Sequence, residues 1–269
     1  MKTKTTYKTL IFDFTLFVFL GIVLWILNIL GQISFPGNNL FPFLMRSTIL
    51  FITVILCYYL NKKFSKKNQL QFDIVKFKSS DIKYYLNAIL LGCILIAIIW
   101  AFTYLIYPFE IVMNPNSKTN LTTDIISYSL GNTLEELLFR GFVLLVSVKL
   151  FGKIGGALFV SLLFGLFHLQ GMGLTANSLS IVTTTFTMSL LFISVIFYTE
   201  SIWTAVTLHI VGNLLLHSFG FDGTDTGVFQ IKFATSTMNV FFLTLIYEIV
   251  VIAFALIIFK KGKNHISFS

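Results

Sequence analysis

Charged residues are scarce in this chain, and their scarcity excludes an ordinary soluble fold. Only 11% of its 269 residues are Asp, Glu, Lys or Arg, whereas about a quarter of the residues in soluble domains are charged. Hydrophobic residues make up 56% of the chain, and the mean hydropathy is +0.88. The composition therefore predicts a polytopic membrane protein.

Proline and glycine are also few, with 4 Pro and 17 Gly against 31 Phe. Long apolar stretches with so few breaks are typical of helices and not of the ~10-residue alternating strands of an outer-membrane barrel. We expect an all-α fold in a single integral membrane domain over residues 1–269, built as a bundle of about eight transmembrane helices. The predicted spans are 9–30, 43–60, 84–107, 121–150, 154–170, 178–199, 201–218 and 238–259.

Lysines gather at alternate connections between these spans, and cytoplasmic flanks retain an excess of Lys and Arg. With the N-terminus inside, only Arg46, Lys118 and Lys232 fall outside. The inside set is Lys2, Lys4, Lys8, Lys62, Lys63, Lys66, Lys67, Lys76, Lys78, Lys83, Lys149, Lys153, Lys260, Lys261 and Lys263. We predict a multi-pass protein of a bacterial plasma membrane with both termini cytoplasmic.

The net charge of +8 is thus a topology signal, and no nucleic-acid partner is expected, because the lysines flank membrane segments. Lipid is the expected surrounding partner. The basic cytoplasmic loop 61–83 mixes lysines with Phe and Ile, and it either lies on anionic lipid or is simply solvated. Cysteine is almost absent: Cys57 and Cys93 lie within predicted spans without metal-binding spacing, so both are expected to be free, buried and inert.

Against this apolar background, Glu135, Glu136 and Arg140 stand within six residues of one predicted span. A charged side chain at the bilayer midplane costs roughly 2.5–3.5 kcal/mol, so the three need partners or a function. Glu136 and Arg140 are spaced i, i+4 with the acid first, which favours an intrahelical ion pair. Glu135 lies about 100° around the helix and remains available, and a desolvated carboxylate is a stronger base for activating water.

Two later spans carry polar groups at helical spacing, His168 one turn after Phe164 and Asn213 one turn after His209. An imidazole and an amide on one helix face can both point at a developing oxyanion. His168 can orient a water or bind a metal. At ~1.5 Å per residue, Glu135 and His168 both lie about 22 Å from the cytoplasmic ends of their helices, so contact between them is plausible. Each motif alone also fits a structural role, such as an ion pair that only aids insertion.

The ordered set Glu135-Glu136-x-x-x-Arg140, Phe164-x-x-x-His168 and His209-x-x-x-Asn213 resembles the CAAX-protease and bacteriocin-processing (CPBP, or Abi) family of intramembrane endopeptidases, over residues 130–215. The resemblance implies an eight-helix bundle and a membrane hydrolase that cuts a hydrophobic or membrane-associated protein or peptide, in CAAX-type or bacteriocin-type processing or in self-immunity. It implies Glu135 as the general base, His168 as holder of the water, and His209 with Asn213 as the oxyanion site. Glu136, Arg140 and Phe164 would support them.

The cofactor question stays open at this point. The family has been called metalloproteases, and a catalytic zinc would want three protein ligands, which Glu135, His168 and His209 supply in number. No H-E-x-x-H pair is present, so the sequence signal for zinc is weak. Two other classes of function remain: a non-catalytic membrane scaffold or immunity protein of the same fold, and a proton-coupled transporter, which is disfavoured because no inverted repeats or broken helices in matching halves are found.

Overall fold

The computed structural model describes residues 81–117, 121–169, 175–220, 227–234 and 240–262, with scattered positions between residues 11 and 62. Most of the predicted spans 9–30 and 43–60 and most of the basic loop 61–83 lie outside the described residues. Within them the chain is mostly helical, as its composition predicts.

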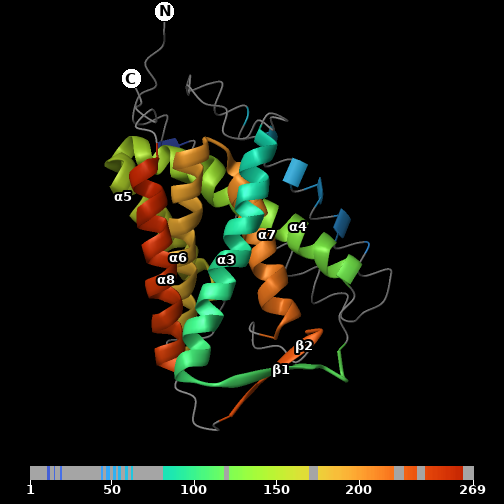
Figure 1. Cartoon of the computed structure of the whole chain (residues 1–269). Helices are drawn as coiled ribbons and strands as arrows, with labels where there is room; N and C mark the ends of the chain where they lie inside the picture. Colours follow the sequence, from blue (N-terminus) through green and yellow to red (C-terminus); the bar gives the residue numbers. More distant parts are fainter. Residues whose placement is uncertain are drawn as a thin grey trace, which may run out of the picture.

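Six α-helices, one π-helical segment and two short strands follow one another along the described chain (Figure 1). In chain order they are α3 (Ile82–Ile106), β1 (Phe109–Met113), α4 (Leu121–Glu136), η2 (Leu137–Val143), α5 (Leu144–Phe167), α6 (Ala176–Thr199), α7 (Ile202–Ser218), β2 (Phe229–Phe233) and α8 (Val240–Lys261).

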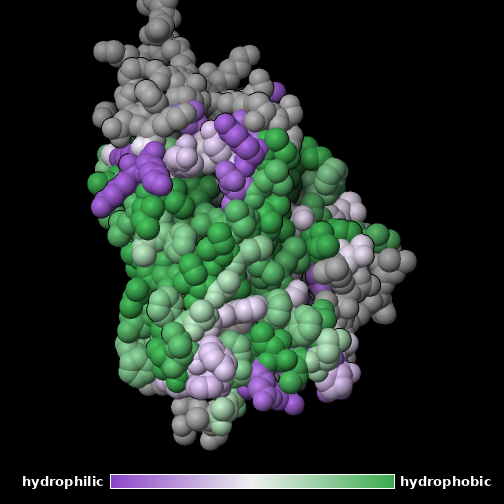
Figure 2. Space-filling view, in the orientation of Figure 1, coloured by the Kyte–Doolittle hydropathy of each residue, from purple (hydrophilic) through white to green (hydrophobic). Residues whose placement is uncertain are grey.

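By length and composition alone, four described helices, α3, α5, α6 and α8, could cross a membrane, although α5 is broken at Gly152. Helix α7 is apolar but has only 17 residues. The predicted count of eight spans is therefore not confirmed. Figure 2 shows that apolar residues cover the middle of the face in view, with hydrophilic residues gathered toward its two ends. Large apolar side chains such as Leu105 of α3 and Ile249 of α8 are exposed, as expected for helices that face lipid. Cys93 is exposed on α3, which corrects the expectation that it is buried.

The chain from Leu121 to Phe167 is helical with one sharp break, at Gly152 (φ 73°, ψ 175°). This left-handed φ is readily adopted by glycine and explains why the predicted spans 121–150 and 154–170 separate here. A Cβ on Gly156 would lie 2.6 Å from the backbone nitrogen of Val148. Residues eight apart in a straight helix are separated by about 12 Å, so α5 folds back on itself at Gly152.

A two-stranded antiparallel sheet, β1 with β2, is a small addition to the helical fold that the sequence predicts. It covers one end of the bundle (Figure 1). Val112 lies opposite Gln230, and Glu110 lies opposite Lys232, an arrangement of opposite charges that stabilises a strand pair. Each strand has only five residues and its partner is more than a hundred residues away, so local periodicity does not reveal the pair.

The helices pack around two neighbouring cores. The larger core joins α3, α6, α7 and α8 to the η2 segment and includes the fully buried Leu137, Leu191 and Ile202. The second core joins α5 to η2 and α6 through Val160 and Ile193. The result is a frame in which α7, the helix that carries His209, lies against α3, α4 and α6.

The strand pairing predicts an efficient cross-link between Val112→Cys and Gln230→Cys in a chain whose native cysteines are replaced by alanine. Opposed residues in an antiparallel pair have Cα atoms about 4.5–5.5 Å apart, within the range a disulfide spans. Oxidation should remove both thiols from labelling by a polyethylene-glycol maleimide. The matched control, Val112→Cys with Lys232→Cys, is diagonal at about 7–8 Å and should remain labelled; equal cross-linking of the two pairs would contradict the register.

Candidate active site

One cavity of about 720 Å³ gathers the four residues proposed from the motifs, and its lining includes Glu135, His168, His209 and Asn213. Its lining comes from all six described α-helices, α3 to α8, and includes Ile231 and Phe233 of β2. Most of the other lining residues are apolar. The polar groups that the sequence spreads over three helices therefore face one largely apolar space inside the bundle.

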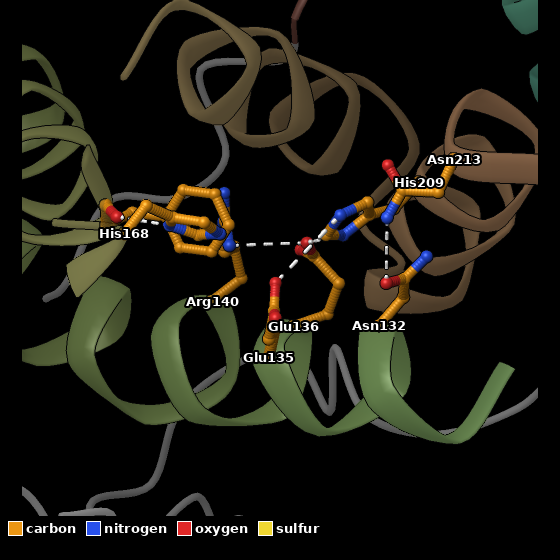
Figure 3. A network of polar contacts seen from close by, with 8 residues as sticks. Asn132, Glu135, Glu136, Arg140, His168, His209 and Asn213 are labelled. Carbon is orange, nitrogen blue, oxygen red and sulfur yellow. Dashed lines mark hydrogen bonds and ion pairs between the residues drawn. The ribbon is translucent and has the colours of Figure 1, made fainter. Parts of the chain in front are cut away.

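Glu136 and Arg140 form the expected i, i+4 ion pair, with Arg140 Nη1 3.2 Å from Glu136 Oε1 and neither side chain exposed to solvent (Figure 3). The Arg140 guanidinium lies 3.9 Å from the centre of the Phe164 ring and 5.3 Å from that of Phe192. These faces stabilise the cation in the absence of water. Arg140 lies in the π-helical segment η2, a distortion often found at functional sites.

Glu136 has a second partner that its sequence spacing does not reveal, because His209 Nδ1 lies 2.9 Å from the same oxygen, Oε1. A carboxylate paired with arginine is an acceptor, so the imidazole donates from Nδ1. The ring of Phe192 stacks on that of His209 with centroids 4.7 Å apart. The carboxylate and the aromatic ring together fix the orientation of His209.

This orientation turns the other nitrogen of His209 toward Glu135, with Nε2 3.9 Å from Oε2 (Figure 3). The Glu135 side chain is 29% exposed, whereas that of Glu136 is fully buried. The adjacent carboxylates thus lie in different settings: Glu136 is enclosed between two cationic or polar partners, and Glu135 borders the cavity.

Asn213 is held by a residue that sequence reasoning missed. Its Nδ2 donates to Oδ1 of Asn132 at 3.1 Å, and Asn132 is only 4% exposed. Asn132 lies three residues before Glu135 on α4, about one turn away, so it shares a side of the helix with the carboxylates. An asparagine one turn before two adjacent acids in an apolar helix is the sequence pattern that could have identified Asn132.

His168 is the residue that follows α5, and its Nδ1 lies 2.8 Å from the carbonyl oxygen of Phe164. This is the backbone bond that a purely structural histidine would make, yet it occupies only one ring nitrogen, and His168 also lines the cavity. The Phe164 ring contacts both imidazoles, with centroids 4.5 Å from His168 and 6.3 Å from His209. The Phe164 ring therefore packs against both histidine rings at the lining of the cavity.

The zinc set considered from the sequence does not fit these positions. In the described part of the chain, no group of three His, Cys, Asp or Glu side chains lies close enough together to hold a metal ion. We therefore derive no chemical step through a metal.

Glu136→Gln should destabilise the protein much more than Glu135→Gln does. Removing one partner of a buried ion pair leaves an uncompensated charge and costs about 3–5 kcal/mol, whereas Glu135 is partly exposed at the cavity. The midpoint of thermal unfolding in detergent, followed by loss of monodisperse protein, measures the difference. Equal midpoints for the two variants would contradict a structural role for the Glu136 carboxylate.

The segment that carries the three motifs matches a known protein family. The family model described as Rce1-like, type II CAAX prenyl endopeptidase, matches residues 119–215. This segment runs from the start of α4 to near the end of α7 and contains all three motifs. No curated protein matches the chain. The segment that builds the polar wall of the cavity is thus similar to the Rce1-like type II CAAX prenyl endopeptidases, a family of proteases, in agreement with the resemblance carried by its motifs.

Proposed function

We propose that this protein is an intramembrane endopeptidase that hydrolyses a peptide bond in a membrane-associated protein or peptide. The observation that carries the proposal is the face-to-face placement of Glu135 Oε2 and His209 Nε2, 3.9 Å apart, at the wall of an apolar cavity. A water beside this pair would have a base and a hydrogen-bonding imidazole within reach. The match to a protease family supports the same reaction class.

In this proposal Glu135 accepts a proton from water as the water oxygen attacks the scissile carbonyl carbon. His168, through the nitrogen not bonded to Phe164, holds the water. The carbonyl oxygen becomes an oxyanion that receives hydrogen bonds from His209 and Asn213. When the tetrahedral intermediate collapses, the carbon–nitrogen bond breaks and Glu135 returns its proton to the leaving amine.

The bond from His209 to Glu136 constrains its role in this reaction. Because Nδ1 already donates to Glu136, Nε2 donates to an oxyanion only when the ring carries both protons. Glu135, Glu136, Arg140 and a charged His209 then sum to zero formal charge. In that state each charge of the cluster has an opposite charge beside it.

The cavity and the family match support a hydrophobic substrate. A space lined mostly by apolar residues suits a hydrophobic segment. CAAX-type processing, bacteriocin-type processing and self-immunity are all consistent with such a segment. Comparing the membrane peptidomes of cells with and without the protein identifies the substrate; unchanged peptide termini across growth conditions would speak against processing.

A non-catalytic scaffold or immunity protein would have the same geometry without turnover, so kinetics decide between the two. Glu135→Gln should reduce single-turnover cleavage of a quenched-fluorescent hydrophobic peptide by about 10²–10⁴-fold, because the amide keeps the shape but accepts no proton. Asn213→Ala should retain more activity, losing about 10²–10³-fold as one oxyanion donor is removed. His168→Ala should be nearly inactive.

The assay uses purified protein in nanodiscs, and each variant is first shown to be inserted and monodisperse. Tyr198→Phe, at a partly exposed ring far along α6 from the cavity lining, is the control and should cleave like the wild type. Full activity in Glu135→Gln would reject the general-base assignment. Loss of activity on adding a chelator, restored by zinc, would reject a reaction carried by protein groups alone.

A further inference from the structure

Most helical glycines described in the core have a packing reason to lack a side chain. A Cβ on Gly92 would lie 2.9 Å from Val211 Cγ1, and one on Gly165 would lie 2.7 Å from the carbonyl oxygen of Val182. Both residues let neighbouring helices approach closely. Glycine destabilises a helix interior relative to alanine, so its presence calls for such a reason.

Gly212 has no such reason. It lies inside α7, and apart from its two chain neighbours and the nearby backbone of its own helix, a Cβ built on it would have no described heavy atom within 4 Å. Its backbone is not in the left-handed region that favours glycine. Neither crowding nor conformation therefore explains why this helical position has no side chain.

The space beside Gly212 is the cavity itself. Gly212 is one of the cavity's lining residues, together with Leu208 and Leu216 one turn before and one turn after it. His209 lies three residues before it and Asn213 directly follows it, so the open position is next to the proposed oxyanion site. Ile96 and Ile99 of α3, the helix packed against α7, line the same cavity.

We propose that Gly212 determines substrate specificity, by leaving room for a large apolar side chain of the substrate next to the scissile bond. The inference rests on the proposed hydrolysis and adds what that hydrolysis selects. Residues three apart on a helix are neighbours about 5–6 Å apart, so a group bonded to His209 and Asn213 places its adjacent side chain over Gly212. The leucines on either side make the surroundings apolar.

Enlarging residue 212 should shift the size preference of cleavage. The probe is a panel of quenched-fluorescent hydrophobic peptides that differ only in the residues flanking the cut bond, from Ala through Leu to Phe. The wild type should prefer Phe or Leu at one flanking position. Gly212→Ala should lower kcat/KM for the Phe peptide by about 10-fold or more relative to the Ala peptide, and Gly212→Leu should lower it further.

Gly131 is a matched control, because it is also a helical glycine, on α4. A Cβ added to it would likewise have no described atom within 4 Å. Unlike Gly212, it is not part of the cavity lining. Gly131→Ala and Gly131→Leu should keep the wild-type order of the peptides. An unchanged order in Gly212→Leu, with cleavage intact, would overturn the inference and leave the hydrolytic function standing.

A second measurement separates this inference from the hydrolysis. Gly212→Cys and Gly131→Cys are made in a Glu135→Gln chain without native cysteines and are modified with a small thiosulfonate. The Phe peptide should slow modification of the cysteine at 212 by about 10-fold and leave the one at 131 unaffected. Protection at 212 combined with no cleavage by the wild type would reject hydrolysis and keep the subsite; no protection at 212 would overturn the subsite.

Discussion

The structure depends on one buried carboxylate. Glu136 binds Arg140 on its own helix and His209 on α7 through the same oxygen, with no exposure to solvent. A charge in this position is tolerated in an apolar bundle only if its partners stay in place. The same contact that satisfies Glu136 therefore ties two helices together and fixes the imidazole ring. The stability of the bundle and the orientation of His209 therefore both depend on the contacts of the Glu136 carboxylate.

Aromatic side chains complete this arrangement without adding polar groups. Phe164 contacts the Arg140 guanidinium on one side and lies between the rings of His168 and His209, while Phe192 stacks on His209. These rings exclude water from the ion pair and leave the open side of the imidazole toward Glu135. The neighbouring carboxylates thereby divide into one that holds the site and one that borders the cavity.

Local spacing was enough to predict the ion pair of Glu136 with Arg140 and the shared helix of His209 and Asn213, because both depend on residues four apart. The contacts of Glu136 with His209 and of Asn213 with Asn132 join residues 73 and 81 apart, and spacing within one helix carries no information about them. The pairing of β1 with β2 could not be predicted for the same reason, since it joins residues more than a hundred apart. Apolarity predicted the long membrane helices, but the count of eight spans is not confirmed, since two predicted spans lie mostly outside the described residues and α4 has only 16 residues with much polar character.

The central claim is that Glu135 activates water for hydrolysis of a peptide bond in this cavity. The most direct measurement is mass spectrometry of hydrophobic peptides incubated in ¹⁸O-labelled water with the protein in nanodiscs. The account predicts that new carboxyl termini appear carrying one ¹⁸O atom with the wild type and do not appear with Glu135→Gln. Labelled termini at the same rate in both, or none with the wild type, would contradict it.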